Sequence, residues 1–232
     1  NTMLRIGGFT PLSTTVWPDQ LAAVVFVQGC PWRCHYCHNV DLQDRDGGLR
    51  DGWPQVLKTL SRRQGLLDGV VFSGGEPTLD PHLHDAIDDV RQLGLKVGLH
   101  TAGIYPDRLI ELLPKVDWVG FDVKTDFAAY ASITAIPRSG LPAWRSLLAL
   151  VQAVQQQGLS LEVRTTWHPE LQSDDQMVAL AQALAQQGIH RWVIQQFRAA
   201  NEQHASLAST WHPPGDLLWQ RLKDTGLSLE LR

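Results

Sequence analysis

The chain has 232 residues, of which 44% are apolar and 19% charged, with a formal net charge of −4. This composition is that of an ordinary globular protein and excludes a disordered or fibrous chain. No apolar run reaches the length of about 18 residues that spans a bilayer. The 20 basic residues are outnumbered by 24 acidic ones and form no dense basic run, so we expect neither a membrane nor a nucleic-acid partner.

The cellular location is predicted from the first residues and from the cysteines. The start of the chain lacks the apolar core of a signal peptide, and Asn1 and Thr2 ahead of Met3 resemble a cloning remnant. All three cysteines lie in the eight residues from Cys30 to Cys37, and an odd, clustered set is not a disulfide framework. We therefore expect a cytoplasmic protein.

Short β-branched runs alternate with segments of helical periodicity along the chain. The runs predict six strands, at 21–27, 69–72, 96–99, 118–123, 161–166 and 192–195. Helices are predicted at 54–63, 81–93, 106–113, 142–157, 173–187 and 216–225, followed by a terminal extended piece at 227–231. The strands are almost continuously apolar, which is typical of a parallel sheet that is buried on both faces.

The alternation of strand and helix predicts an α/β fold. The units average about 35 residues, which suits βαβ units. A closed eightfold barrel typically needs about 250 residues, so the length favours an open, partial (β/α)6 TIM-like barrel, with a doubly wound sheet as the alternative. We expect one domain over 1–232, with an N-terminal extension (1–20), a core of about 21–200, and a C-terminal helix and tail (201–232).

The first predicted strand is followed by a cysteine loop. Cys30, Cys34 and Cys37 have the spacing C-x3-C-x2-C, which can place three thiolates around one face of a compact metal site. Three protein ligands leave a coordination position open for chemistry. The spacing alone also allows a zinc site completed by His35 or His38, which would describe a zinc-stabilised binding module, or unrelated buried cysteines.

With Tyr36 included, the loop resembles the C-x3-C-x-aromatic-C signature of the radical S-adenosylmethionine (SAM) enzymes. The resemblance implies the radical SAM fold and a [4Fe-4S] cluster that is held by Cys30, Cys34 and Cys37. It also implies that SAM binds the fourth iron, with Tyr36 beside the adenine. Reductive cleavage of SAM would then give a 5′-deoxyadenosyl radical, so that the cofactors carry the chemistry.

A glycine-rich turn follows the second predicted strand. Gly74 and Gly75 permit a tight turn, and Glu76, ahead of Pro77, offers a carboxylate at the end of the strand. Taken alone, the four residues are compatible with an ordinary turn. The resemblance implies that they form the motif that binds the ammonium group of SAM.

His100 and Thr101 follow the third predicted strand. In one branch of the radical SAM family, the activating enzymes of glycyl radical enzymes, an acidic residue followed by T-N-G stands here. Thr101 and Gly103 match this pattern, whereas His100 and Ala102 depart from it. A cation site that depends on the acidic residue is therefore not carried over. We expect Thr101 to line the cofactor site and His100 either to hydrogen-bond the cofactor or to cap the sheet.

Charged side chains follow the remaining strands. Asp122 and Lys124 share one face of a strand by the two-residue period, and Lys124 is expected to pair with the SAM carboxylate or, alternatively, with Asp122. Arg164 is a second candidate for that carboxylate, although an arginine that extends from the sheet to solvent would have the same sequence pattern. Arg198 follows Phe197 at a position where some activating enzymes have histidine, and we include it among the cofactor-binding candidates.

Further residues narrow the resemblance to the branch that activates glycyl radical enzymes. His38 and Asn39 follow Cys37 as in this branch, and residues 7–15 look most like the activating proteins of anaerobic ribonucleoside-triphosphate reductases. Residues 16–19 depart from the D-x-P-G of related activating enzymes. No cysteine follows Cys37, so cysteines can hold one cluster only.

The resemblance implies an activase that generates a glycyl radical on a partner enzyme. The expected partner is an anaerobic ribonucleotide reductase, and the expected electron donor is a flavodoxin or a ferredoxin-like protein. The alternatives are activation of another glycyl radical enzyme, such as pyruvate formate-lyase, and small-molecule chemistry of the 7-carboxy-7-deazaguanine synthase type. The zinc-stabilised binding module stays open as the non-enzymatic alternative.

Overall fold

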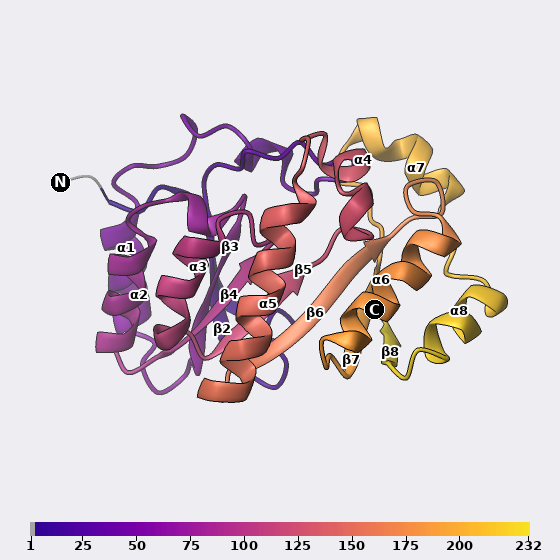
Figure 1. The fold of residues 1–232 in the computed structure, drawn as a ribbon. Helices are drawn as coiled ribbons and strands as arrows, with labels where there is room; N and C mark the ends of the chain where they lie inside the picture. Colours follow the sequence, from indigo (N-terminus) through magenta and orange to yellow (C-terminus); the bar gives the residue numbers. More distant parts are fainter. Residues whose placement is uncertain (1–2) are drawn as a thin grey trace.

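The computed structural model describes residues 3–232; Asn1 and Thr2, interpreted above as a cloning remnant, lie outside the described residues. One eight-stranded sheet follows the chain order from β1 to β8 (Figure 1). The strands are β1 (Ile6–Ser13), β2 (Ala22–Val27), β3 (Gly69–Gly74), β4 (Lys96–Thr101), β5 (Trp118–Asp122), β6 (Ser160–Trp167), β7 (Arg191–Gln196) and β8 (Ser228–Leu231). β1 runs antiparallel to β2, and all other neighbours are parallel.

A helix connects each pair of consecutive parallel strands. These helices are α1 (Trp53–Ser61), α2 (Leu83–Gln92), α3 (Pro106–Leu112), α5 (Gly140–Gln157), α6 (Asp174–Gln186) and α8 (Asp216–Lys223). The shorter helices are α4 (Ala131–Thr134), α7 (Ala205–Thr210) and the 3-10 turns η1 (Val40–Leu42), η2 (Pro77–Leu79), η3 (Leu113–Lys115), η4 (Phe127–Ala129) and η5 (Glu202–His204). None of the helices within residues 3–232 combines the length and apolar character of a bilayer-spanning segment.

The sequential strand order explains the shape of the molecule. Right-handed crossovers between successive neighbours place their helices on the same face of the sheet, and α3, α5 and α6 lie together in front of the strands in Figure 1. β1 and β8 are the two edges of the sheet, so the barrel is open. The predicted α/β fold with a partial TIM-like barrel is confirmed.

The sheet has two edge strands in addition to the six strands predicted from the sequence. β1 lies in the predicted N-terminal extension, where Gly7, Gly8 and Pro11 interrupt the apolar pattern, and only Ile6 of its residues is buried. Proline is tolerated in such an edge strand because one side of the strand needs no ladder hydrogen bonds. The extended piece predicted in the C-terminal tail is β8, which pairs with β7. The sheet therefore reaches beyond the expected core of 21–200 at both ends.

Local sequence signals explain where the helices begin and end. Ser173 caps α6, and a reciprocal capping box joins it to Gln176. Gly158 ends α5 in the left-handed conformation, with φ of 69°, which glycine adopts without steric cost. Prolines at the predicted helix starts lie within two residues of the observed ones: Pro54, Pro81, Pro106 and Pro142. Helix α5, for example, begins at Gly140 rather than at Pro142.

A tryptophan from the segment between β1 and β2 fills one end of the barrel interior. The ring of Trp17 stacks on Trp118, with 5.5 Å between ring centroids and 16° between ring planes. Gly69 and Gly98 provide the space, because a Cβ atom would lie 2.8 Å from this ring at Gly69 and 2.9 Å from it at Gly98. Trp17 thus closes the interior at the amino ends of the strands, and the opposite end remains open.

Candidate active site

A cavity of about 730 Å3 lies inside the open barrel at the carboxyl ends of the strands. It is lined by nearly all the residues predicted from the sequence: Cys30, Cys34, Tyr36, Cys37, Gly74, Gly75, Glu76, His100, Thr101, Asp122, Lys124, Arg164 and Arg198. Pro77 is the exception, because it is buried at the start of η2. The topology therefore brings motifs from six strand ends to one space.

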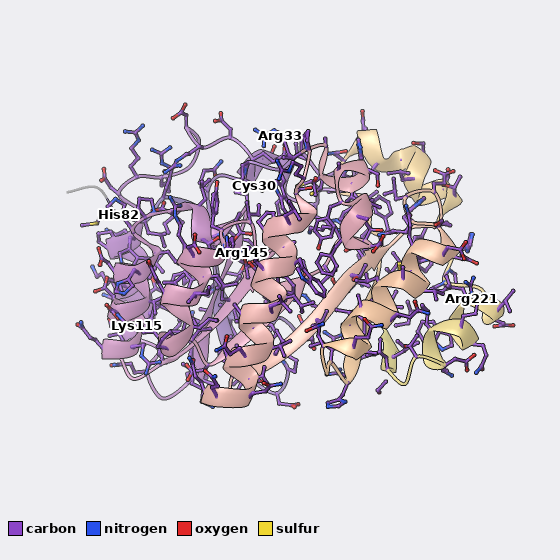
Figure 2. All side chains as sticks on the ribbon, viewed as in Figure 1. Cys30, Arg33, His82, Lys115, Arg145 and Arg221 are labelled. Carbon is purple, nitrogen blue, oxygen red and sulfur yellow. The ribbon has the colours of Figure 1, made fainter. Side chains whose placement is uncertain are left out.

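The cysteine loop is held by backbone hydrogen bonds to other segments. The Gly29 N–H donates to the carbonyl of Leu42 at 2.7 Å. On the other side, the Arg33 N–H donates to Thr134 O at 3.0 Å and the His35 N–H to Ile133 O at 3.1 Å. Cys30 and Arg33 lie at the edge of the molecule where the strands end (Figure 2). Helix α4, which the sequence did not predict, thus anchors the loop through two backbone carbonyls.

The three cysteines are free thiols that are only partly exposed. Burial, followed by the nearby Glu76, raises the pKa of Cys30 to about 12, and burial also raises the pKa of Cys34. Such thiols become thiolates when a bound metal supplies positive charge. Among residues 3–232, no three Cys, His, Asp or Glu side chains converge on one metal ion. The cysteines of a [4Fe-4S] cube bind separate irons, so a ligand set spread over the wall fits a cluster.

Two glycines bring the turn after β3 against the cysteine loop. Gly74 has a backbone φ of 121°, which residues with a side chain rarely adopt. A Cβ atom at Gly75 would overlap the carbonyl oxygen of Gly29. The close approach allows the Glu76 N–H to donate to that carbonyl at 2.8 Å, and the Asn39 amide donates to Gly74 O at 3.3 Å. The turn and the loop therefore form one unit.

Four donors fix the carboxylate of Glu76. Its Oε1 accepts from the hydroxyl of Thr78 at 2.5 Å, the Thr78 N–H at 3.2 Å and the hydroxyl of Thr101 at 2.7 Å, and its Oε2 accepts from the Ala102 N–H at 3.0 Å. Burial raises the pKa of Glu76 despite these bonds. The side chain is 1% exposed and still lines the cavity. A desolvated carboxylate in this position favours a cationic ligand.

Replacement of Thr101 by valine is expected to weaken SAM binding and to lower the free energy of unfolding by about 1.5–3 kcal/mol. The hydroxyl donates to Glu76 and accepts from the Gly103 N–H at 3.0 Å, so both partners would lose a buried hydrogen bond. Urea unfolding and SAM titration of the reconstituted protein measure the two effects. Thr101→Ser, which retains the hydroxyl, should preserve both values, and equal losses in the two variants would contradict this role.

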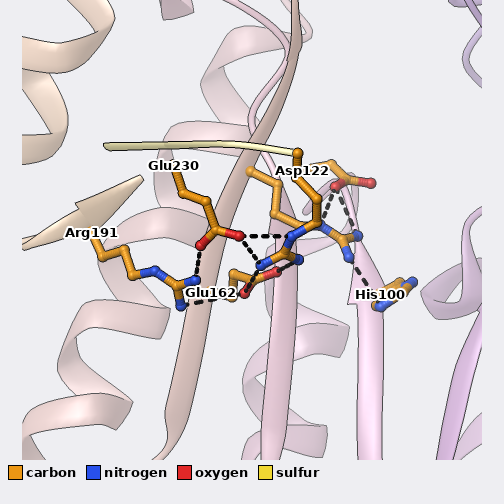
Figure 3. Close-up of polar contacts among 7 residues, drawn as sticks. His100, Asp122, Glu162, Arg191 and Glu230 are labelled. Atoms are coloured by element: carbon orange, nitrogen blue, oxygen red, sulfur yellow. Dashed lines mark hydrogen bonds and ion pairs between the residues drawn. The ribbon is translucent and has the colours of Figure 1, made fainter. Parts of the chain in front are cut away.

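At the cavity floor, Arg164 contacts both Asp122 and His100, and the latter two residues are labelled in Figure 3. Its Nε and Nη2 each lie 2.9 Å from Asp122 Oδ1, and its Nη1 lies 3.1 Å from His100 Nε2. A guanidinium only donates, so His100 Nε2 must accept, and the ring proton is on Nδ1, 3.2 Å from Ser73 Oγ. Burial and then the Arg164 charge lower the pKa of His100 to about 3, so the ring is neutral.

The charged groups on the floor have different partners from those that the sequence suggested. Asp122 pairs with Arg164 rather than with Lys124, and Arg164 is 9% exposed inside the barrel instead of extending to solvent. Burial alone would raise the pKa of Asp122, but Arg164 and then Lys124 outweigh it and lower the pKa. The two-residue period of the strand correctly predicted that Asp122 and Lys124 face the same side. It could not identify Arg164, on the neighbouring strand, as the partner of Asp122.

Lys124 projects into the cavity near Tyr36. Its Nζ lies 5.7 Å from the centroid of the Tyr36 ring. Burial opposes ionisation, but the neighbouring Tyr36 and Asp122 outweigh it, so the pKa of Lys124 lies above its ordinary value. The Tyr36 hydroxyl is buried without a hydrogen-bond partner within residues 3–232. The ammonium of Lys124 can pair with an anionic group of a ligand, and the ring of Tyr36 can stack on a flat group of the same ligand.

Several other residues of the cavity wall were not among the predicted cluster and cofactor residues. They are Thr15, Val16, Trp32, His38, Asn39, Gln43, Ser73, Ala102, Ile104, Thr166, Gln195, Gln196 and Arg232. Thr15 and Val16, which follow β1, and Arg232, which follows β8, were missed because these two strands were not assigned to the sheet. Gln195 ends a predicted strand and Gln196 follows it, and this position was the available signal.

Comparison with known proteins identifies the family. The family model of the Radical SAM superfamily matches residues 24–181, which is more than half of the chain. This chain belongs to the Radical SAM superfamily. A radical SAM enzyme uses a [4Fe-4S] cluster and SAM, and the cavity with its three cysteines fits both. The match does not support the zinc-stabilised binding module.

Relatives within the superfamily include activating enzymes. This radical SAM chain is 28% identical over 200 residues to a candidate glycyl-radical enzyme activating enzyme of Methanocaldococcus jannaschii, covering 83% of this chain and 79% of the relative. It is 33% identical over 157 residues to the pyruvate formate-lyase-activating enzyme of Clostridium pasteurianum, covering 65% of this chain and 63% of the relative. A radical SAM methyltransferase structure from Sphaerobacter thermophilus shares the fold, with a TM-score of 0.69, 16% identity and coverage of 95% of this chain and 68% of that chain.

Proposed function

We propose that this chain is an activase that uses SAM to generate a glycyl radical on a partner enzyme, and that the partner is an anaerobic ribonucleotide reductase. The observation that carries the activase proposal is the similarity to a candidate activating enzyme over most of both chains. The partner rests on the resemblance of residues 7–15 to the activating proteins of these reductases. Pyruvate formate-lyase is a second candidate partner, because its activating enzyme is also a relative.

The cavity suggests roles for the residues predicted to hold the cluster and the amino acid part of SAM. Cys30, Cys34 and Cys37 hold the cluster, which supplies the electron for SAM cleavage. Glu76 accepts a hydrogen bond from the SAM ammonium, since its Oε2 has a single protein donor in the described structure. Lys124 pairs with the SAM carboxylate, because Asp122 is already paired with an arginine.

The aromatic and glycine residues complete this assignment. Tyr36 lies beside the adenine, and Gly74 and Gly75 bring the glutamate to the cysteine loop. Pro77 starts the 3-10 turn that presents the hydroxyl of Thr78 to Glu76. It therefore acts through that turn rather than by contact with the cofactor.

The cavity wall near β6 and β7 suits a polypeptide substrate. Thr166, Gln195, Gln196 and Arg198 line this side, and their hydroxyl, amide and guanidinium groups can hydrogen-bond to peptide groups. In a substrate glycine, only backbone peptide groups flank the Cα hydrogen that is abstracted. A wall that hydrogen-bonds to peptide groups can therefore orient this glycine. A flavodoxin or a ferredoxin-like protein is the proposed electron donor.

Anaerobic mixing with purified candidate partners tests the function. With SAM and a reductant, the reconstituted chain should produce a glycyl radical signal in the electron paramagnetic resonance spectrum of the anaerobic ribonucleotide reductase. A signal with pyruvate formate-lyase instead would replace the partner and keep the activase. The Glu76→Gln variant is the matched control, and it should give little radical with the same partner. SAM cleavage without a glycyl radical on either partner would refute the proposal.

A further inference from the structure

The activating enzymes that this chain resembles have an acidic residue at the position of His100, on the floor of the cavity. Here burial lowers the pKa of His100 so far that the ring carries no charge. The positive charge on the floor is that of the neighbouring Arg164. The Arg164 guanidinium lies within hydrogen-bond distance of both His100 and Asp122. This charge belongs to a side chain of the protein, so it is present without any added ion.

A metal cation does not fit between these groups. Monovalent and divalent hard cations prefer oxygen ligands, and His100 offers a ring nitrogen that already accepts from Arg164. Asp122 Oδ1 accepts from two nitrogens of the same guanidinium. A cation bound to this oxygen would lie against the arginine and be repelled by it. The aspartate is 33% exposed, so the pair still faces the cavity.

We propose that Arg164 supplies, as part of the chain, the positive charge that a monovalent metal cation would provide on the cavity floor, so that SAM binds without any added cation. Arg164 acts as a positioning residue that neutralises Asp122 beside the carboxylate of SAM. The inference rests on the proposed placement of SAM in this cavity, and it is independent of the partner enzyme.

The first test replaces the cation of the buffer. SAM affinity of the anaerobically reconstituted protein is measured in sodium, potassium and choline chloride at equal ionic strength, by titration of the cluster signal in electron paramagnetic resonance. The three values should agree within about twofold, which is about 0.4 kcal/mol. A several-fold loss of affinity in choline would overturn the proposal, because choline is too large to replace a bound metal ion.

The second test removes the guanidinium. Arg164→Ala should weaken SAM binding by about tenfold, as expected for the loss of one partly buried charge. Guanidinium chloride at low millimolar concentration should restore the affinity, whereas urea, which has a similar shape and no charge, should not. Equal effects of the two additives, or an unchanged affinity, would contradict the role of the charge.

Two variants serve as controls for folding and for general electrostatics. Arg191→Ala removes an arginine that pairs with Glu162 and Glu230 and does not line the cavity, so SAM affinity should stay unchanged. If Arg164→Ala does not fold, Arg164→Lys and Arg164→Gln replace it as a pair of variants with and without a positive charge. In the same buffers, Arg164→Lys should bind SAM more tightly than Arg164→Gln. Iron content and circular dichroism show whether each variant is folded and loaded.

A double variant tests the inference in the opposite direction. His100→Asp combined with Arg164→Ala places two carboxylates on the floor and removes the guanidinium, so SAM binding should become dependent on sodium or potassium. Binding that stays weak in every salt would contradict the proposal. All these measurements omit the partner enzyme. Cation-independent binding and guanidinium rescue can therefore hold even if no partner acquires a radical, which keeps the two proposals separable.

Discussion

Replacement of Cys34 by alanine is expected to abolish cluster assembly and, with it, all SAM cleavage. The chain has three cysteines, and all of them are in one loop, so no other thiol can replace the missing ligand. A cluster held by two cysteines loses iron readily because each thiolate neutralises part of its charge. Iron content after anaerobic reconstitution and the formation of 5′-deoxyadenosine measure the two losses.

His35→Ala and His38→Ala are the matched controls in the same loop. Both side chains are exposed, and His35 contributes its backbone N–H to loop anchoring, which alanine retains. Each variant should keep its iron, and His35→Ala, whose side chain does not line the cavity, should also keep its SAM cleavage. Loss of metal in one of the histidine variants, together with stoichiometric zinc in the unaltered protein, would instead support a Cys3His zinc site.

Gly75→Ala is expected to disrupt the active site through steric overlap. The new Cβ atom would overlap the carbonyl oxygen of Gly29 and lie 2.9 Å from the carbonyl oxygen of Leu42. Both are backbone atoms that cannot rotate away, so the turn and the cysteine loop must separate. We expect a loss of about 1–3 kcal/mol in the free energy of unfolding and a loss of most of the bound iron. Urea unfolding and iron analysis measure these effects.

Gly8→Ala provides the comparison for a glycine with room for a side chain. A Cβ atom there would lie 3.4 Å from a side-chain carbon of Phe26, which is ordinary van der Waals contact. Its free energy of unfolding should change by no more than about 0.5 kcal/mol, and its iron content should equal that of the unaltered protein. Equal behaviour of the two variants would show that the close approach at Gly75 has no structural consequence.

The parts of the fold that depend on local pattern could be predicted from the sequence. Continuous apolar runs identified β2 to β7, and parallel order then placed the chemistry at one end of the barrel. The cysteine spacing and the glycine turn are also local signals, and both line the cavity. The antiparallel strand β1 was missed because its glycines and proline conceal the pattern.

Contacts between distant residues could not be predicted in this way. Arg164 is 42 residues from Asp122 along the chain, and its hydrogen bond depends on the register of β5 against β6. Helix α4 supports the cysteine loop through backbone groups, which leave no trace in side-chain patterns. The position of Trp17 depends on glycines in two other strands.

The packing of Trp17 has an evolutionary consequence. Because its ring occupies the space left by Gly69 and Gly98, an alanine or larger residue at either position would collide with it. Conversely, loss of the tryptophan alone would leave a void under Trp118. Positions 17 and 98 should therefore covary among homologues, with a side chain at position 98 only in sequences that carry a smaller residue at position 17. Position 69 should stay glycine in either case, because a Cβ atom there would also lie 2.8 Å from the backbone carbonyl oxygen of Lys96.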